Sequence, residues 1–475
     1  MASRKIPFPV QTAPGTKSQE GGGRIINGYV DELGPQAPNQ WTIRRMPGLV
    51  NFGTTGRAGF RGAFLTGGNL FSAWNGKLER HTSAGGASTA VGNLNGTKRG
   101  FFAANNNSPT KDFFFTDPDG NIATFTTGSV TNGYPDPDLP SPNSLDFQDG
   151  FTVFTIADGR FFATDVNSTN VNALSFGRAQ AKPGGLILVK SWGGRLLVCG
   201  PVDIEIWANV ASSPFPFQRS TVIPRGIAGP YCMAGTEDNW SKGPIWVGDD
   251  NRVYKLDGYA PSPISPSDLD TLIEKVVDKT TIETTTFMAH GHAFFEVKSP
   301  TWSWVLDTNT GKWFQSESYL GILTRRMSAV SAYNKWICGD TKTGNLQQIT
   351  EAAQDEIGDP LRLRIESGPV MDFPSGATVG RADFYFATGV GQATGADPIQ
   401  TNPDVEISWS DDGGLTWSNP IVRKLGRQAE PRQLISLVSC TGKTSWIGRR
   451  WRLDVSNPVY ASFLYATQDT DPRAR

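Results

Sequence analysis

Two histidines separated by one residue come nearest to a metal-binding pattern in this sequence. His290 and His292 lie in the segment MAHGHAFFEV, and alternate residues of a strand share one face, so both rings are predicted to point the same way. Two imidazoles are a weak metal signal, and the third histidine of the chain, His81, is far away in sequence. We therefore interpret this segment as an ordinary strand surface.

A second pattern with chemical potential is the segment SWSDDGGLTW, which fits the Asp-box S-x-D-x-G-x-T-W known from sialidase propellers. Ser410 and Asp412 can bond turn amides, Gly414 supplies a positive φ, and Trp417, next to Thr416, can pack underneath. A sialidase also needs an arginine triad, a tyrosine nucleophile and an acid, and no such set can be assigned. We interpret the single box as a structural turn.

We also interpret two other acidic clusters as turns. Asp249-Asp250-Asn251 and Asp307-Thr308-Asn309 fit hairpin turns, with calcium binding as the alternative. The sequence has no P-loop, nucleophile elbow, HExxH or GxGxxG in a βαβ unit, and it has three histidines in 475 residues. The prediction is a protein that is not an enzyme, with no catalytic, cofactor-binding or metal-binding residues and no cofactor.

The elements that carry these residues are short apolar bursts, each closed by a Gly, Asp or Asn turn. Their starts lie 33 to 57 residues apart, and a hairpin repeated about every 45 residues is typical of β-propellers. We predict an all-β protein with a propeller of about six blades, give or take one. The seven bursts are Phe64–Trp74, Phe113–Phe125, Phe151–Asp165, Arg195–Asn209, Ile245–Gly258, Trp302–Gln315 and Lys335–Ile349.

The composition agrees with a strand-rich fold that does not bind nucleic acid tightly. The 53 glycines and 32 prolines favour tight turns over long helices, while the 27 phenylalanines and 14 tryptophans suit the cores of strands. The net charge of −1 argues against a general nucleic-acid binder. No CxxC pair occurs, so the cysteines are expected to be buried free thiols: Cys199, Cys232, Cys338 and Cys440. No secretory leader is expected at the N-terminus, and no apolar run is long enough to span a membrane.

Three regions are predicted. Residues 1–55 form an extended arm and first strand, where the arm either links subunits or is a flexible leader. Residues 56–350 form the propeller, and residues 351–475 a C-terminal β-sandwich that holds the Asp-box. Few helices are expected, and the clearest one is predicted over Ser265–Lys279, with Ser265 as N-cap and Pro266 in the first turn.

The order of several segments resembles the tail-nozzle family of short-tailed bacteriophages, the packaged-DNA stabilisation proteins of P22-like phages. No single segment is specific, but the ordered set covers most of the chain from Arg44 to Thr467. The segments are RRMPGLVNFG, RGAF, LDFQDGFTVFT, GGRLLVCGPVDIEIWAN, SPFPFQR, RGIAGPYCMAG, PIWVGDDNRVYKLDGYAPSPIS, ISWSDDGGLTW and RWRLDVSNPVYASFLYAT.

The resemblance implies a structural virion protein of the phage tail, assembled in the host cytoplasm. Six copies would form a ring below the portal and adaptor, continue the channel through which double-stranded DNA passes, help retain the genome, and carry a needle or plug and fibres or tailspikes. A propeller glycoside hydrolase acting on host polysaccharide is the alternative, and a carbohydrate-binding module is a third hypothesis. A lumen that passes DNA should not hold phosphates, so the pairs Arg44-Arg45, Arg325-Arg326 and Arg449-Arg450 are expected to face protein neighbours or the outer surface.

Overall fold

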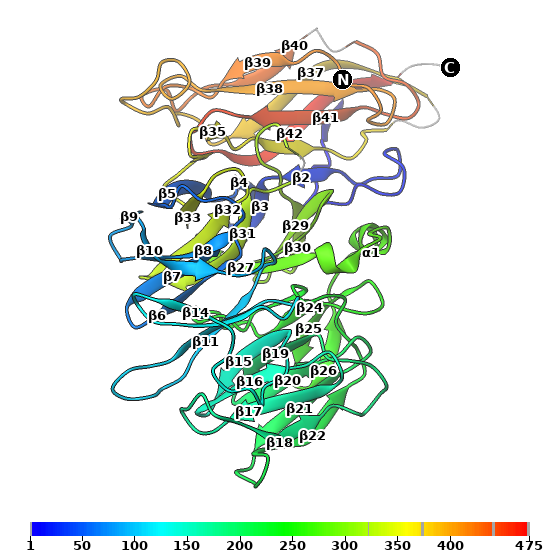
Figure 1. The fold of residues 1–475 in the computed structure, drawn as a ribbon. Helices are drawn as coiled ribbons and strands as arrows, with labels where there is room; N and C mark the ends of the chain where they lie inside the picture. The colour runs from blue at the N-terminus through cyan, green and yellow to red at the C-terminus, as the bar shows by residue number, and fades with distance from the viewer. Residues whose placement is uncertain (1, 322, 372–374, 439–441, 473–475) are drawn as a thin grey trace. The chain divides into compact units, whose positions relative to one another are not determined.

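The structure is a computed structural model that describes residues 2–321, 323–371, 375–438 and 442–472. The chain divides into two compact units (Figure 1). The propeller unit comprises residues 51–300 and 325–349, and the sandwich unit residues 1–50, 301–324 and 350–475. The regions 1–55, 56–350 and 351–475 expected from the sequence remain a prediction.

The propeller unit is built of antiparallel meanders whose strands follow one another in chain order. Five of them have four strands each, and we number them as blades 1 to 5. Their strands are β6 Gly62–Thr66, β7 Asn69–Trp74, β8 Gly76–His81 and β10 Thr89–Leu94; β11 Phe101–Ala104, β12 Phe113–Thr116, β13 Ile122–Phe125 and β14 Val130–Asn132; β15 Ser144–Gln148, β16 Phe151–Thr155, β17 Arg160–Thr164 and β18 Val171–Arg178; β19 Leu188–Trp192, β20 Arg195–Cys199, β21 Ile204–Asn209 and β22 Phe217–Ile223; β23 Met233–Ala234, β24 Ile245–Val247, β25 Val253–Asp257 and β26 Ala260–Pro263.

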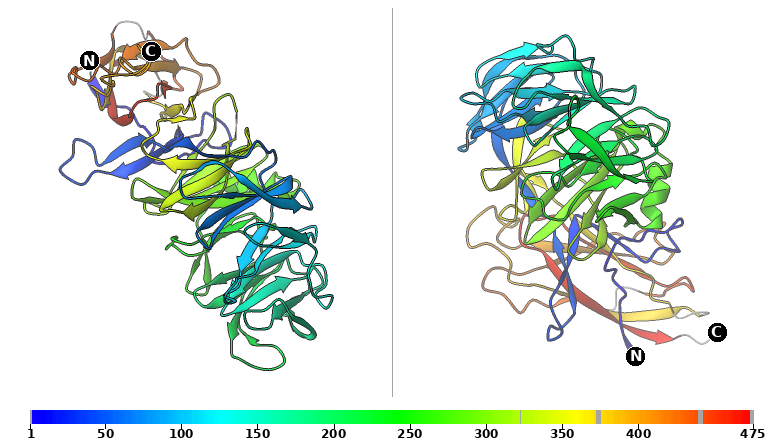
Figure 2. Two further views of the ribbon diagram at one scale, coloured as in Figure 1. Left: turned by 60° about the vertical axis from the view of Figure 1, so that its left-hand side comes forward. Right: turned by 90° about the horizontal axis from the view of Figure 1, so that it is seen from below.

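Two further sets of strands complete the ring. Blade 6 supplies β27 Glu283–Ala289 and β28 His292–Ser299, and blade 7 supplies β31 Arg326–Ala332, β32 Lys335–Asp340 and β33 Asn345–Thr350. The first strands of neighbouring blades contact one another from blade 1 to blade 4 and from blade 5 to blade 7, and β31 returns to contact β6. Within the described residues there are therefore seven blades. The propeller fold that the hairpin spacing predicted is confirmed, and the seven blades fall within the predicted range of about six, give or take one. Figure 2 shows these sheets from two further sides.

The ring is closed by residues that precede blade 1 in sequence. The strand β5 (Gly48–Thr54) continues into Thr55, whose N–H donates to the carbonyl of Gly344 in blade 7 at 3.1 Å. On the other side, the two-residue strand β9 (Gly86–Ala87) pairs in parallel with the end of β5. Joining the start of the chain to the last blade lets the propeller close without leaving an open sheet edge at this seam.

Aromatic side chains fill the space between adjacent blades, since each sheet must bury both faces. Between blades 1 and 2, Phe71 lies with its ring centroid 5.6 Å from that of Phe113 and 5.1 Å from that of Phe125. Between blades 3 and 4, Phe161 and Trp207 pack edge to face at 4.9 Å. The Phe-rich and Trp-rich bursts of the sequence thus form the contacts that hold neighbouring blades together.

The sandwich unit consists of two sheets packed face to face. Trp451 fills the space between them, with its ring 5.3 Å from that of Phe384 and its Nε1 donating to Gln468 Oε1 at 2.8 Å. One sheet has the order β3-β4-β42-β37-β40 with β1 also paired to β42, and the part of the other in this unit runs β29-β30-β2-β36-β41-β38-β39. The strands are β1 Ala2–Lys5, β2 Arg24–Ile26, β3 Gly28–Glu32, β4 Trp41–Arg45, β29 Trp302–Asp307, β30 Lys312–Gln315, β36 Leu363–Glu366, β37 Ala377–Phe386, β38 Asp404–Ser410, β39 Ile421–Lys424, β40 Ile435–Val438, β41 Arg450–Val455 and β42 Ser462–Pro472, with the short β34 Asp355–Glu356 and β35 Asp359–Pro360 beside them.

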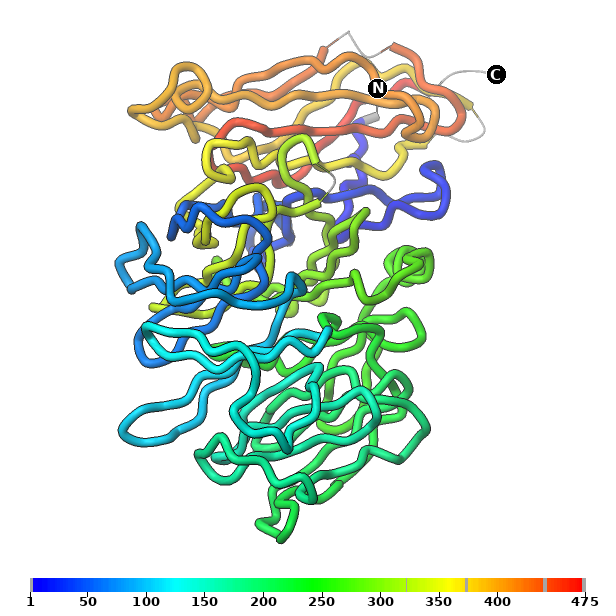
Figure 3. The backbone as a smooth tube through the Cα atoms, viewed as in Figure 1, coloured from blue at the N-terminus to red at the C-terminus, as the bar shows by residue number. Residues whose placement is uncertain are grey.

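The N-terminal residues form strands in both sheets of this unit, and their path can be followed in Figure 3. β1 pairs antiparallel with β42, from the register Ala2↔Thr470 to Lys5↔Thr467. β2 lies between β30, to which it is parallel, and β36, to which it is antiparallel. Between these strands the hydroxyl of Thr12 donates to Ile25 O at 2.8 Å and accepts from Ile25 N at 3.0 Å. The segment predicted as an arm therefore uses its backbone groups within its own chain.

The predicted helix is shorter than expected and is capped differently. The one α-helix of the described residues, α1, runs Ser267–Glu274, with Pro266 at the N-cap and no side-chain capping bond. Ser265, the predicted cap, instead donates to Asp270 Oδ1 and accepts from the backbone N–H of Val253, so that it extends the pairing of β25 with β26. Past Glu274 the chain turns into a 3₁₀ segment, Lys279–Thr281. Among the described residues no helix is long and apolar enough to cross a membrane.

Candidate functional site

The centre of the propeller unit holds a cavity of about 230 Å³. The first strands of several blades line it, because these strands are the ones nearest the ring axis. Its polar wall contains Arg99, Asp146, Lys190, Glu237 and Asp238. None of these five residues stood out in the sequence, where they are isolated or paired charges close to apolar strands.

Arg99 and Asp146 of this cavity contact neighbouring side chains and the backbone. Arg99 Nη2 donates to Ser328 Oγ at 3.0 Å, and its guanidinium lies 5.3 Å from the ring centroid of Tyr231. Asp146 accepts from the backbone N–H of Ser191 at 2.9 Å. Burial raises the pKa of Asp146, while the positive charge of Lys190 opposes that shift. These contacts link different blades, and the cavity wall carries both positive and negative side chains.

Three arginines of the propeller unit are buried in ion pairs that tie its strands together. Arg61, which precedes β6 of blade 1, places Nη2 2.9 Å from Asp117 Oδ2 in the β12–β13 turn of blade 2, and both side chains are fully buried. Arg325 contacts Asp340 through two N–O distances of 3.0 and 2.6 Å. Arg326 pairs with Glu296 of blade 6. Buried guanidinium–carboxylate pairs with two parallel hydrogen bonds fix geometry strongly, as in Arg325–Asp340 and Arg326–Glu296. Arg61–Asp117 and Arg326–Glu296 join adjacent blades, whereas Arg325–Asp340 lies within blade 7.

The expectation that the paired arginines face neighbours or the outer surface is wrong for five of the six. Arg45, Arg325, Arg326, Arg449 and Arg450 are at most 5% exposed. Arg45 donates to four backbone carbonyls of the sandwich unit, those of Gln354, Val455, Asn457 and Val459. Arg44 keeps partial exposure and pairs with Asp31 at 2.6 Å. These side chains hold the fold together instead of forming an external basic surface.

The two histidines of the H-x-H pattern do not share a strand face, so that prediction is wrong. His290 lies in the turn between β27 and β28 with a φ of 54°, because Gly291 follows it and the two residues form the hairpin turn. His292 is buried on β28 with its ring stacked on Phe294 at 5.9 Å. His81 is buried in blade 1, where Nε2 lies 3.2 Å from Ser72 Oγ and burial lowers its pKa to about 4.

The acidic turns predicted from the sequence are turns in the structure. Asp250 accepts a hydrogen bond from Tyr254 OH at 2.6 Å in the β24–β25 hairpin. Asp307 accepts from Asn309 N at 3.0 Å and from Thr310 Oγ1 at 2.9 Å in the β29–β30 hairpin. Among the residues that the structure describes, no three His, Cys, Asp or Glu side chains gather in a way that could hold a metal ion.

The segment that fits the Asp-box forms the turn after β38. Asp412 Oδ1 accepts from the backbone N–H groups of Leu415 and Thr416, each at 3.0 Å, and Oδ2 accepts from Thr416 Oγ1 at 2.5 Å. Ser410 Oγ donates to Asp412 Oδ1 at 2.7 Å and accepts from Gly414 N at 2.8 Å. Burial favours a higher pKa for Asp412, but the hydrogen bonds from Thr416 and Ser410 dominate and lower it.

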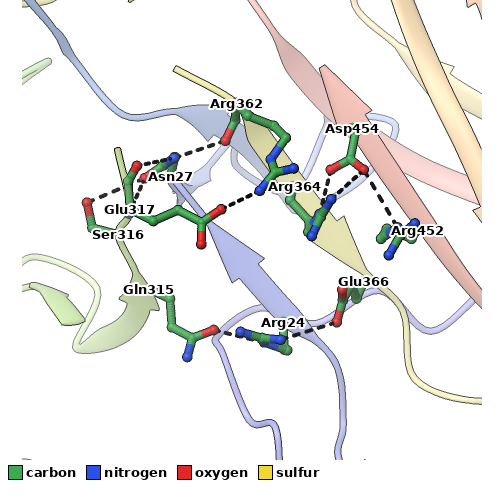
Figure 4. A network of polar contacts seen from close by, with 10 residues as sticks. All are labelled: Arg24, Asn27, Gln315, Ser316, Glu317, Arg362, Arg364, Glu366, Arg452 and Asp454. Atoms are coloured by element: carbon green, nitrogen blue, oxygen red, sulfur yellow. Dashed lines mark hydrogen bonds and ion pairs between the residues drawn. The ribbon is translucent and has the colours of Figure 1, made fainter. Parts of the chain in front are cut away.

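A polar network joins four strand ends of the sandwich unit (Figure 4). Arg364 makes a two-pronged ion pair with Asp454, at 2.7 and 2.9 Å, and Arg362 lies 2.6 Å from Glu317. Asn27 spans the same region by donating to the carbonyls of Glu317 and Arg362 at 2.8 and 3.0 Å. Residues from the two ends and the middle of the sequence meet in this network, so no local pattern could have predicted it.

Three of the four cysteines are free and buried, which agrees with the expectation from their spacing. Burial raises the thiol pKa of Cys199 and Cys232, and it raises that of Cys338 to about 12. Thiols of this kind stay protonated at neutral pH and are poor nucleophiles. The fourth, Cys440, lies outside the described residues.

The fold and these sites define a β-propeller protein whose buried polar groups stabilise its architecture. A family model described as Bacteriophage P22 Gp10, beta-propeller, matches residues 35–354, more than half of the chain, and this chain belongs to that family. The family is one of phage structural DNA-stabilisation proteins, so the resemblance noted in the sequence is confirmed and the chain is assigned to the structural components of a phage virion tail.

Comparisons with individual proteins add little. No curated protein matches this chain. The computationally designed Ika8 protein is 12% identical with a TM-score of 0.37, over 63% of this chain and 89% of the designed one. PorZ, an essential bacterial surface component of the type-IX secretion system of Porphyromonas gingivalis, is 14% identical with a TM-score of 0.36, over 72% of this chain and 45% of PorZ. Likenesses this loose carry no argument about function.

Proposed function

We propose that this protein is the tail nozzle, or tail hub, of a short-tailed phage. Six copies form a ring below the portal and adaptor, and the ring continues the DNA channel, retains the packaged genome and carries a tail needle or plug and fibres or tailspikes. Assembly takes place in the host cytoplasm. The observation that carries the proposal is family membership over residues 35–354.

The build of the molecule supports a load-bearing role. A propeller is a stiff ring of sheets with few open edges, and here buried ion pairs such as Arg61–Asp117 cross from one blade to the next. The Asp-box turn supports a structural role as well, because the carboxylate of Asp412 accepts hydrogen bonds from the backbone of its own turn. The overall charge of −1 suits the wall of a channel that must release DNA.

Reconstruction of the assembled tail by electron cryo-microscopy tests this proposal. Rotational symmetry makes each contact between copies heterologous, with different surfaces facing each other, and the ring closes on itself. We expect six copies around the channel, in contact with the portal-side proteins on one face. A two-fold dimer in the particle, or absence of the chain from the tail, would overturn the proposal.

A further inference from the structure

The loop that joins the first two strands of blade 5 is the longest connection of its kind among the described residues of the propeller unit. Five of the seven blades make this connection with two residues, as Gly193 and Gly194 do between β19 and β20. Between β11 and β12 of blade 2 it takes eight residues, 105–112, and between β23 and β24 it takes ten, 235–244. A hairpin does not need a loop of ten residues, so this loop calls for an explanation of its own.

Two glycines bring the ends of this loop together. Gly235 has a φ of 98° and Gly243 a φ of 80°, and a Cβ placed on Gly235 would lie 2.4 Å from Gly243 O. Between them, Trp240 folds back and donates from Nε1 to Gly243 O at 3.0 Å. A compact loop whose ends are close and whose own side chain packs against its base is an Ω-loop. Glycines at both ends tolerate large changes of backbone angle and suit the loop to move as one piece.

Two side chains of the loop tie it to blades 6 and 7. Glu237 Oε2 accepts from Thr286 Oγ1 of β27 at 3.0 Å, and Asn239 Nδ2 donates to Ser331 Oγ of β31 at 2.8 Å. Blades 5 and 7 are not neighbours, so the second bond reaches past the inner strand of blade 6. Residues 236–238 of the same loop form part of the wall of the central cavity. The loop therefore lies across one end of that cavity.

Arg99 crosses the axis at the other end. It precedes β11 of blade 2, yet its Nη2 donates to Ser328 Oγ of blade 7 at 3.0 Å and its Nη1 lies 3.8 Å from Glu283 Oε2 of blade 6. Its carbonyl accepts from the hydroxyl of Tyr231, just before β23 of blade 5, at 2.8 Å. Blades 5 and 6 lie opposite blade 2 in a ring of seven. Because Tyr231 precedes β23 and the loop follows it, the two crossings lie at opposite ends of this strand.

We propose that the loop 235–244 is a lid on the axial cavity, which opens about Gly235 and Gly243 and admits small solutes, while Arg99 obstructs the far end. Opening breaks the hydrogen bonds of Glu237 to Thr286 and of Asn239 to Ser331 and leaves the strands of the blades paired. A local opening of this kind needs far less free energy than unfolding of the propeller.

Lys190 of blade 4 reports on the state of the lid. Its half-buried side chain belongs to the cavity wall, and Nζ lies 5.4 Å from the ring centroid of Phe101 of blade 2. An amine reacts with an acyl reagent only where the reagent can reach it. Lys182, which is exposed, supplies the reference within the same protein.

Acetylation of the full chain by an acetyl succinimidyl ester, followed over time by mass spectrometry of its peptides, tests the proposal. We expect Lys190 to react at least about tenfold more slowly than Lys182, because the two bonds keep the lid closed most of the time. Asn239→Ala or Ser331→Ala should raise the rate at Lys190 about two- to tenfold, since each removes the same single bond. The rate at Lys182 should not change.

A double variant and a control separate opening of the lid from other effects. Asn239→Ala combined with Ser331→Ala should react at Lys190 like either single variant, because both changes break one bond. Ser241→Ala is the matched control: this loop residue is exposed, and the variant should react like the parent protein. Thermal unfolding of each variant shows that the propeller stays folded. Equal rates at Lys190 and Lys182 in the parent protein, an unchanged rate at Lys190 in both single variants, or additive effects in the double variant would each overturn the proposal.

Discussion

Arg326 and Glu296 form a fully buried ion pair between blades 7 and 6 of the propeller. Nε lies 3.2 Å from Oε2 and Nη2 lies 3.3 Å from Oε1, and each side chain is 1% exposed. The guanidinium also lies 5.3 Å from the ring centroid of Phe287 on β27. The pair therefore lies where the last blade meets the one before it.

Removing one charge of this pair should destabilise the propeller unit strongly. Glu296→Gln leaves the Arg326 guanidinium buried beside a neutral amide, and loss of one partner of a buried pair costs about 3–5 kcal/mol. Urea unfolding followed by tryptophan fluorescence measures the loss as a lower midpoint. Asp158→Asn is the control: its pair with Arg160 is exposed, so the expected change is about 1 kcal/mol or less. Equal midpoints for the two variants would contradict the structural role of the buried pair.

Closure of the ring should depend on the absence of a side chain at Gly344. A Cβ at this position would lie 1.9 Å from Arg57 O and 2.6 Å from Arg57 N, both backbone atoms of the segment that precedes blade 1. Gly344→Ala should therefore force the seam apart and cost about 1–3 kcal/mol. Thermal unfolding and amide hydrogen exchange around residues 53–57 measure the effect.

Gly128→Ala supplies the comparison for the seam. No heavy atom lies within 4 Å of a Cβ placed on Gly128, so this variant should melt like the parent protein. If Gly344→Ala also melts unchanged, with no increase in exchange at residues 53–57, the seam does not depend on the close approach of the two segments.

The hairpin spacing of the sequence predicted the propeller well, because each blade is a local unit whose strands follow one another. The burst Phe151–Asp165, for example, supplies β16 and β17. The sixth burst, Trp302–Gln315, forms β29 and β30, which belong to the sandwich unit, while the inner strand of blade 6 comes from the threonine-rich segment Glu283–Ala289. That segment has no aromatic side chain beyond Phe287, so no burst marked the start of the sheet β27-β28-β29-β30, of which the predicted burst forms the later hairpin.

Pairings between distant residues could not be predicted in the same way. β2 joins β36, so that Arg24 faces Glu366 across 342 residues of chain, and nothing near Arg24 indicates its partner. The arginine pairs illustrate the same limit: a run of charge usually marks a solvated surface, and only the tertiary structure brings Glu296 to Arg326 and Asp411 to Arg449. His290 was misplaced because the alternation of H-x-H does not reveal that Gly291 turns the chain.

The turn after β38 should depend on the carboxylate of Asp412. Asp412→Ala removes acceptors for the N–H groups of Leu415 and Thr416 and for the Thr416 hydroxyl, each worth about 0.5–1.5 kcal/mol. We expect a lower melting temperature for the sandwich unit, with assembly into the tail retained. A variant that melts like the parent protein would show that these bonds do not hold the hairpin.

Acid should destabilise the propeller unit through His81. Burial lowers the folded-state pKa of this imidazole to about 4, with the nearby Glu79 opposing the shift, while an unfolded chain has a value of about 6.5. Between those values the unfolded state binds more protons, so stability is complete above about pH 6.5 and falls as the pH drops toward 4. His81→Asn cannot titrate, and the slope of stability against pH in this window should be shallower in the variant. Identical slopes would show that another group carries the acid sensitivity.

Free protein should bind duplex DNA weakly at physiological salt. Strong binding requires several Lys or Arg contacts to phosphates, and log K falls with log salt by about 0.9 for each contact. Five of the six residues in the arginine pairs are at most 5% exposed and engaged inside the chain, so they are unavailable for such contacts, and the net charge is −1. Fluorescence anisotropy with a labelled duplex, repeated at several salt concentrations, measures affinity and slope together. We expect a dissociation constant above the micromolar range and a shallow slope, whereas sub-micromolar binding would contradict a channel wall that lets DNA pass.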